Sequence, residues 1–401
     1  MTDPTPKIHR IARVAQAFTP SAPVDRLSVF AGRFAQIQDV VSAVSQRGQH
    51  VGLYGERGVG KTSLANVLAE FFADSELSQY QSALINCNSD DTFESIWENI
   101  LRELQLDPRA GLSPEDVRRA IASLDPPALI VIDELDRLDD DASLTLLADT
   151  IKTLSDHHVL STLVLVGVAR SIGDLIGEHE SIVRNVAQIE MPRMTLKELC
   201  EVVEKGCERA GLTGRSEAID KIALLSEGLP HYTHLLGLHA GQHVVQDDRS
   251  EVTLADVNAA IPGAIRRHTI QSDYLKAIRS TQSTNLYRQV LLACALAPKN
   301  ELGYFTAGAI RDALEVIAGR RLDIPAFARH LKQFLQIERG SVLQREGEPR
   351  HYFYRFTDPI LQPYVILNGL AEGLLTDGQL VDLQGEVPTR EPETIRPQQL
   401  F

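Results

Sequence analysis

Between residues 27 and 192, short apolar runs rich in β-branched residues alternate with stretches whose apolar positions recur at a helical period. This alternation is typical of a parallel sheet whose strands are joined by helices that cover its faces. The pattern predicts five strands, at residues 50–54, 82–86, 128–133, 162–168 and 187–191. The segment is therefore predicted to have an α/β fold.

After residue 195 the strand signals stop and helical periods follow. Helices are predicted at residues 196–210, 216–226 and 232–245, and together they indicate a small helical lid. Farther along, three helical patterns precede two short alternating runs that resemble a hairpin; these five elements lie at residues 287–297, 306–318, 325–336, 341–344 and 350–356. This order is typical of a winged-helix domain.

These patterns divide the chain into six predicted parts: an N-terminal segment (1–26), an α/β core (27–194), a helical lid (195–265), a linker (266–284), a winged-helix domain (285–370) and an acidic, disordered tail (371–401). In the first part, Ile8, Ile11, Val14 and Phe18 fall near one helical face. We expect a short amphipathic helix that packs on the body or on a neighbouring subunit. A mitochondrial-type presequence is the alternative, and a secretory signal is disfavoured because no continuous apolar run is present.

Composition limits the number of domains and the classes of function. A chain of 401 residues implies two or three compact units. Its longest apolar runs fall far short of the ~18 residues that span a bilayer, so no membrane helix is expected. The four cysteines form no CxxC pair and lie in apolar or helical stretches, which favours buried thiols and a reducing cytoplasm. The net charge of −14 should repel nucleic acid unless positive charge is segregated.

The most specific chemical signal follows the first predicted strand and matches the pattern GxxxxGK[ST]. Its glycines let backbone N–H groups curl around phosphate oxygens, and the helix that follows contributes its positive end. Lys61 is expected to contact the β- and γ-phosphates of ATP, and Thr62 to bind Mg²⁺. The candidate nucleotide-binding residues of this loop are Gly55, Glu56, Arg57, Gly58, Val59, Gly60, Lys61, Thr62 and Ser63.

Two adjacent carboxylates, Asp133 and Glu134, end the apolar run that starts at Ala128. Ligands of α/β sheets bind beyond the carboxyl ends of the strands, so Asp133 is predicted to reach Mg²⁺ and Glu134 to polarise an attacking water. A helix-capping role for Asp133 is the alternative. Asp136 and Arg137 in the same turn are interpreted as structural or exposed.

Two arginines are candidates for stabilising the charge of the transition state. Arg170 follows the fourth predicted strand, where a guanidinium can contact the γ-phosphate; an ion pair with a helix carboxylate is the alternative. Arg184 precedes the fifth strand, where it can project into the site of a neighbouring subunit as an arginine finger.

The lid contributes two more candidates, because Pro230 and His231 open a helix that can close over the base or phosphates. The histidines of this helix include His239 and His243 at i, i+4, a spacing that suits a metal. No cysteine or carboxylate completes a tetrahedral set, so packing or surface roles are favoured.

Several motifs together resemble bacterial AAA+ ATPases, between the origin-recognition initiator ATPases and the STAND signalling ATPases. The resemblance covers residues 27–370 and rests on Phe30-Ala-Gly-Arg33, Asp133-Glu-Leu-Asp136, Arg170 after Gly-Val-Ala, Met191-Pro-Arg-Met with Glu198-Leu, and Gly228-Leu-Pro230. It implies an AAA+-like P-loop core, with Arg33 near the adenine, followed by a lid and a C-terminal winged helix. Arg170 and Pro230-His231 depart from the initiator pattern and are closer to STAND proteins, which use ATP as a slow conformational switch.

Positive charge is segregated into the predicted winged helix, where residues 285–365 hold 11 Lys or Arg against 8 Asp or Glu. Arg329 and Lys332 lie on the expected recognition helix, and Arg345 and Arg350 flank the expected wing tip, which are positions that contact duplex DNA in such domains. In STAND-type proteins the same domain commonly packs on the ATPase and gates it.

Three functional hypotheses follow. The leading one is a Mg-ATP-binding, slowly hydrolysing AAA+/STAND-like switch that assembles as a homo-oligomer when ATP binds. The alternative is a DNA-binding regulator, initiator or loader that ATP licenses to bind duplex DNA. In the third, the tail that ends at Phe401 docks a protein effector.

Overall fold

The computed structural model describes residues 5–24, 30–74, 80–108, 111–169, 171–176, 183–266, 270–280, 285–300, 302–348 and 351–384. The chain consists of two compact units, Met1–Ala260 and Ile261–Phe401. In the described part of the chain, no helix combines the length and apolar character that crossing a membrane requires.

A five-stranded parallel sheet forms the centre of the first unit, and it confirms the predicted α/β fold. The strands are β1 (His50–Tyr54), β2 (Gln81–Asn86), β3 (Ala128–Asp133), β4 (Thr162–Gly167) and β5 (Val186–Glu190). Their order across the sheet is β2-β3-β4-β1-β5, so β1 lies between β4 and β5. The loop that leaves β1 therefore starts beside the carboxyl ends of two other strands.

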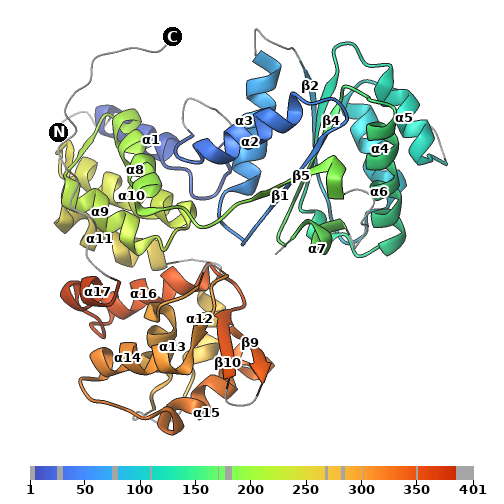
Figure 1. Ribbon diagram of the computed structural model, residues 1–401. Helices are drawn as coiled ribbons and strands as arrows, with labels where there is room; N and C mark the ends of the chain where they lie inside the picture. Colours follow the sequence, from blue (N-terminus) through green and yellow to red (C-terminus); the bar gives the residue numbers. More distant parts are fainter. Residues whose placement is uncertain are drawn as a thin grey trace. The chain divides into compact units, whose positions relative to one another are not determined.

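Helices cover both faces of this sheet (Figure 1). On one face lie α2 (Phe34–Val44) and α3 (Lys61–Asp74). On the other lie α4 (Phe93–Glu103), α5 (Pro114–Ala122), α6 (Asp141–Asp156) and the short α7 (Ile172–Ile176). Every residue of β3 and β4 is buried, as expected for central strands covered on both sides.

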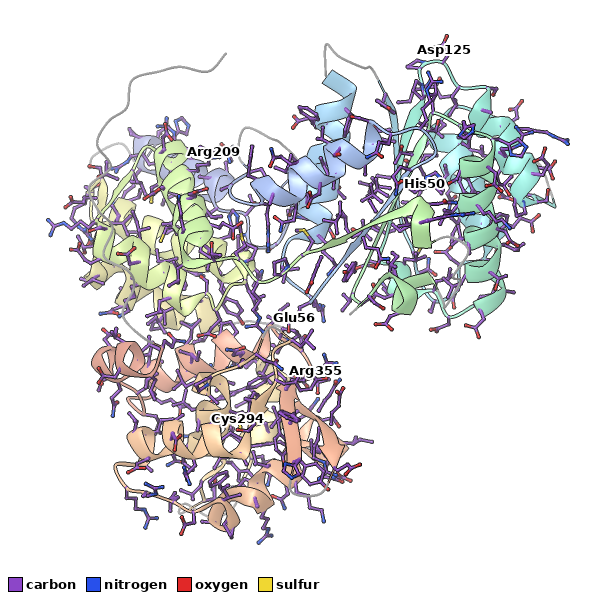
Figure 2. The ribbon with its side chains drawn as sticks, viewed as in Figure 1. His50, Glu56, Asp125, Arg209, Cys294 and Arg355 are labelled. Carbon is purple, nitrogen blue, oxygen red and sulfur yellow. The ribbon has the colours of Figure 1, made fainter. Side chains whose placement is uncertain are left out.

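The interior of the sheet is closely packed around β1. A Cβ placed on Gly52 would lie 2.2 Å from Cδ1 of Ile172, so only glycine allows α7 to approach the strand this closely. His50, labelled in Figure 2, is fully buried, and its Nδ1 accepts a hydrogen bond of 3.0 Å from the Leu163 amide of β4. Burial lowers the pKa of His50 to about 4, so the side chain is neutral in the folded protein.

A helical segment follows the sheet and contains α8 (Leu196–Ala210), α9 (Ser216–Leu225), α10 (Pro230–Gln246) and α11 (Leu254–Ile265). Two dipeptide strands, β6 (Thr213–Gly214) and β7 (Glu251–Val252), pair within it. A capping box between Thr195 and Glu198 starts α8, and Gly211, with a φ of 69°, ends it. The predicted helix 196–210 is confirmed at both ends.

The N-terminal helix α1 (Thr5–Ala17) packs on α8 and α10. The ring of Phe18, just beyond it, lies against two glycines: a Cβ on Gly206 or Gly237 would be 2.3 or 2.4 Å from Cε1 of Phe18. Val14 packs on Gly241 of α10, where a Cβ would be 2.8 Å from Cγ1 of Val14. The expected amphipathic helix is therefore present and packs on the body of its own chain.

The described part of the second unit contains the six helices α12 to α17 and a small antiparallel sheet in the order β8-β10-β9. Its helices are α12 (Gln271–Ile278), α13 (Tyr287–Leu296), α14 (Ala307–Ala318), α15 (Ile324–Phe334), α16 (Leu361–Ala371) and α17 (Asp377–Gln384). Its strands are β8 (Phe305–Thr306), β9 (Leu343–Glu348) and β10 (His351–Phe356). The order of three helices and a hairpin, α13-α14-α15-β9-β10, is the one that the sequence predicts.

Two segments that we expect to be irregular contain helices. Within the expected linker, α12 buries Tyr274, Ala277 and Ile278, which recur at i, i+3 and i+4. Within the expected disordered tail, α17 buries Leu380, and Gln379 Nε2 donates to the Val316 carbonyl at 3.2 Å. In each segment, the burial of one to three apolar side chains stabilises a helix although most of the residues are polar. Residues 385–401 lie outside the described part of the chain.

Candidate nucleotide-binding site

The loop between β1 and α3 requires glycine at three positions. Gly55, Gly58 and Gly60 have φ values of 149°, 85° and 97°, which side-chain-bearing residues rarely adopt. A Cβ on Gly55 would also lie 2.4 Å from the carbonyl oxygen of Met191, just beyond β5. The loop then enters α3 at Lys61, so the N-terminus of a 14-residue helix faces it. This is the geometry that binds phosphate through backbone N–H groups.

Lys61 folds back over this loop. Its Nζ donates to the carbonyls of Gly55 at 3.0 Å and Glu56 at 2.9 Å, and the residue is only 8% exposed. Burial lowers the pKa of Lys61 to about 8, and the negative charges of Asp136, Asp133 and Glu56 oppose that shift. A phosphate beside Nζ would favour the charged form further, so the lysine is placed for an anionic ligand.

Asp133 ends β3 next to the first turn of α3, and it is 3% exposed. Burial raises the pKa of this carboxyl, while hydrogen bonds from the Thr62 hydroxyl and the Glu134 amide oppose the rise. A hydroxyl and a carboxylate that meet in this way provide the hard oxygen ligands that Mg²⁺ prefers. Thr62 and Asp133, the two residues expected to bind Mg²⁺, therefore lie together at the end of the sheet.

Glu134 follows Asp133 with a φ of 54° and faces solvent. Its Oε2 accepts a hydrogen bond of 2.6 Å from Nη1 of Arg137, in an ion pair whose side chains are about half exposed. Asp136 instead accepts from the Val168 amide at 2.7 Å, which holds the turn after β3 against the end of β4. The structural or exposed roles expected for Asp136 and Arg137 agree with these contacts.

Arg33 lies behind the loop as a buried cation that is 2% exposed. Its Nη2 donates to the Val59 carbonyl at 2.9 Å and to the Pro192 carbonyl at 2.5 Å. Its backbone amide donates to Oε1 of Glu198 at 2.8 Å, at the start of α8. Burial lowers the pKa of Arg33, and the nearby Glu198 carboxylate opposes this. The side chain thus ties the loop to the segment that enters the lid.

Arg193 makes a second connection from the loop to the helical segment α8–α11, the expected lid, and the sequence pattern does not reveal it. Its Nε donates to Oε2 of Glu56 at 2.7 Å, and both side chains are about a quarter exposed. Its Nη1 donates to the Glu227 carbonyl at 3.0 Å, in the turn before α10. Arg193 lies in the Met191-Pro-Arg-Met motif, but a single arginine after proline carries no periodic signal that would reveal its partners.

The start of α10 lies beside the loop, because Pro230 Cγ would be 3.8 Å from a Cβ on Gly60. The adjacent His231 forms a hydrogen bond of 2.9 Å between Nδ1 and the Pro20 carbonyl, and burial lowers its pKa. The Val24 amide donates to the Ser63 hydroxyl at 3.1 Å. Residues 20–24 therefore contact both the lid helix and the first turn of α3.

The remaining candidates are placed as follows. Arg57 is exposed on the loop and Val59 is buried in it. Arg184 is exposed in the short 3-10 helix Val183–Asn185 before β5. Arg170 and Arg350 lie outside the described residues.

One histidine of α10, His243, lies together with two carboxylates, Asp247 and Asp256, which we did not expect from the sequence. His243 Nδ1 lies 2.7 Å from Asp256 and 4.0 Å from Asp247, which is a spacing that a metal would tolerate. Arg249 donates to both carboxylates, to Asp256 Oδ2 at 3.0 Å and to Asp247 Oδ2 at 3.1 Å. Its guanidinium occupies the position of a cation, so the cluster is a closed ion-pair network that joins α10 to α11.

The segment that contains this site matches a known protein family. Residues 44–176 match the family model described as AAA domain. With the five-stranded sheet and the loop geometry, this match identifies the segment as an AAA-type P-loop domain. No curated protein gives a significant match to the chain.

Three solved structures resemble the chain along most of its length. The ORC2 protein of Aeropyrum pernix, solved as ADPNP–ADP complexes, is 15% identical with a TM-score of 0.50; the match covers 89% of this chain and 98% of that one. The ORC1 protein of the same organism, in complex with DNA, is 17% identical with a TM-score of 0.50 and coverages of 90% and 97%. A Walker-type ATPase of Pyrococcus abyssi is 18% identical with a TM-score of 0.52 and coverages of 87% and 99%. At these identities the likeness concerns the fold.

We predict that Gly55→Ala lowers the free energy of unfolding by about 3 kcal/mol, because the new Cβ meets a backbone carbonyl and the φ is unfavourable. ATP affinity should fall as well, since the loop must move. Gly111→Ala is the matched control: its φ is 69°, but no atom lies within 4 Å of the new Cβ, so the loss should be about 1 kcal/mol. Urea unfolding measures both, and equal losses would contradict the assigned packing.

Proposed function

We propose that this protein is a Mg-ATP-binding, slowly hydrolysing switch of the AAA+/STAND type, whose nucleotide state sets its conformation, its assembly or its engagement of a partner. One observation carries the proposal. Lys61 and Thr62 follow the phosphate-binding loop and lie beside Asp133 at the end of the sheet. Arg33 and Arg193 connect this loop to the expected lid.

The residues act in the following way. Backbone N–H groups of the loop and the start of α3 bind the phosphates, and Lys61 contacts the β- and γ-phosphates. Thr62 and Asp133 hold Mg²⁺, which when bound would neutralise charge on the phosphate oxygens. Glu134 orients a water for attack on the γ-phosphate. The Glu134–Arg137 ion pair is exposed, so water screens it and the carboxylate is easily released.

Slow turnover is explained if a cation of the site must come from a neighbouring subunit. Arg184 is exposed in the 3-10 helix Val183–Asn185, just before β5. We infer that it acts as an arginine finger in the site of a neighbouring subunit. Arg170 is proposed to contact the γ-phosphate within the same subunit.

ATP would also change the contacts that hold the lid. Lys61 donates to the carbonyl of Glu56, and the Glu56 side chain pairs with Arg193, which in turn holds Glu227. If a bound phosphate draws Lys61 Nζ toward itself, the hydrogen bond from Nζ to the Glu56 carbonyl is lost. The nucleotide thereby acts on the turn that begins α10, and this supports a switch over a simple binding module.

A second candidate function, duplex DNA binding, is favoured by the exposed charges of the second unit. Helix α15 buries Phe327, Leu331 and Phe334 and exposes Arg329 and Lys332. On β9, Arg345 is exposed, with its guanidinium 4.1 Å from the centre of the Tyr352 ring. We interpret this unit as a winged helix with α15 as the recognition helix, so ATP would license contacts of these cations with DNA phosphates.

We expect Lys61→Ala to weaken ATP binding at least ~100-fold, because the cation facing the phosphates is lost. Glu134→Gln should keep ATP affinity within ~threefold and lower turnover by ~100-fold or more. Lys152→Ala removes an exposed lysine from α6 and should change neither property. A fluorescent ATP analogue and phosphate release measure the two; unchanged ATP affinity in Lys61→Ala would refute the proposal.

The same phosphate-release assay, run over a wide range of protein concentration, tests assembly. Turnover per subunit should rise with concentration in the wild type and stay low in Arg184→Ala. Turnover that is independent of concentration, with Arg184→Ala equal to wild type, would exclude an arginine finger in trans.

For DNA, we expect Lys332→Ala to weaken duplex binding on all sequences and to lower the slope of log K against log salt by about 1, since one phosphate contact is lost. Lys152→Ala again serves as the lysine control. Fluorescence anisotropy with a labelled duplex, with and without ATP, gives both quantities. Binding that Lys332→Ala leaves unchanged would place any DNA contact elsewhere.

A further inference from the structure

The second unit contains a cavity of about 640 Å³ that the AAA-type site does not use. It lies where the end of α12, the start of α13, α15 and the 3-10 helix Ile337–Arg339 meet. Cavities that bind small ligands have volumes of roughly 300–1,000 Å³, so this one has the size for such a molecule. The residues that carry the argument are Lys276, Arg279, Tyr287, Arg329, Gln333 and Arg339.

The lining is strongly positive in an acidic protein. Four of the lining side chains are cationic, and among the described residues that line the cavity only Glu338 is acidic. Asp273 pairs with Lys276 at 3.0 Å, which leaves the three arginines as the main source of charge. Because the whole chain carries a net charge of −14, this concentration of cations is local. A concave surface of one sign focuses its potential on a ligand of the opposite sign.

Arg339 is already held in position. Its Nη1 donates to the Ala277 carbonyl at 2.9 Å and to the Arg279 carbonyl, at the end of α12. Its guanidinium carbon lies 3.8 Å from the centre of the Tyr287 ring. In the described structure both of its hydrogen bonds come from Nη1, so Nε and Nη2 can donate to a ligand. A cation fixed before binding loses little conformational entropy when an anion arrives.

Two further features of the lining suit a phosphate-bearing molecule. The ten-residue helix α13 begins at Tyr287 on the cavity wall, where Oδ1 of the neighbouring Asn285 accepts a hydrogen bond of 3.2 Å from the Tyr287 amide. The positive end of that helix adds to the arginine charges. Gln333 on α15 has a buried Oε1 with no hydrogen-bond partner. A buried amide without a partner favours a ligand that also offers a hydroxyl or an amino group.

We propose that this cavity binds a small phosphorylated molecule that carries a hydroxyl or amino group, as an effector site separate from the P-loop. The arginines 279, 329 and 339 hold the phosphate, the start of α13 faces it, and Gln333 accepts from the polar group of the ligand. The site belongs entirely to the second unit, so it stands or falls independently of ATP binding at Lys61.

The test uses the full chain carrying Lys61→Ala, so that phosphate binding at the P-loop is suppressed, and inorganic pyrophosphate as the probe. Calorimetry should find one site per chain. Arg279→Ala should lower the affinity at least tenfold, and Arg279→Lys should lie between it and the parent chain. Arg279 is exposed, so neither variant should disturb the fold, and thermal unfolding checks this. Lys332→Ala is the matched control on α15, outside the cavity, and should leave the affinity unchanged.

Three outcomes would overturn the proposal. The first is absence of pyrophosphate binding at millimolar concentration. The second is an equal loss of affinity in Arg279→Ala and Lys332→Ala, which would mean diffuse attraction to a basic surface. The third is displacement of pyrophosphate by a DNA duplex with the same dependence on Lys332, which would assign the arginines to a DNA backbone contact instead.

Discussion

The largely buried ion pair between Glu56 and Arg193 is the interaction on which the proposed switch depends. It joins the phosphate-binding loop to a residue 137 positions away, and Arg193 then holds the Glu227 carbonyl at the entry to α10. Its side chains are 24% and 26% exposed, against 54% and 49% for the Arg137–Glu134 pair. Water therefore screens it less, and breaking it leaves two poorly solvated charges.

The two ion pairs have different consequences for the same site. The exposed pair at Glu134 is weak, so in the proposed switch it would open easily and would not block hydrolysis. The largely buried pair at Glu56 resists opening, so in the proposed switch a nucleotide that disturbs the loop would move the lid with it. The buried Arg33 makes a second connection, because its guanidinium donates to one carbonyl on the loop and to another before α8.

The sequence identifies those site residues that lie close together along the chain or directly after a predicted strand. Gly55 to Thr62 form one turn, and Asp133 directly ends a buried strand, so spacing and apolar pattern locate both. The contacts of Arg193 escape this approach, and so do those of Arg33, which the resemblance places near the adenine. Their partners lie far away along the chain and include backbone carbonyls, which no side-chain motif encodes. The cavity beside Arg339 escapes it for the same reason, since four separate elements build its wall.

The fold follows the same division. The strands of the parallel sheet are predictable to within a residue or two, because central strands are apolar throughout and end sharply. Helices α12 and α17 are not, because three buried residues in one and Leu380 in the other outweigh polar surroundings only once the rest of the unit is there to cover them.

Hydrogen exchange of the lid, measured with and without saturating Mg-ATP, tests most directly whether nucleotide acts on the lid through Glu56. In the wild type, ATP should change exchange both in the loop at residues 55–62 and in the segment 227–236 at the start of α10. In Glu56→Gln, which still binds ATP, the loop should respond and the α10 segment should not. A wild type in which only the loop responds, or a Glu56→Gln variant whose lid responds as the wild type does, would contradict the account.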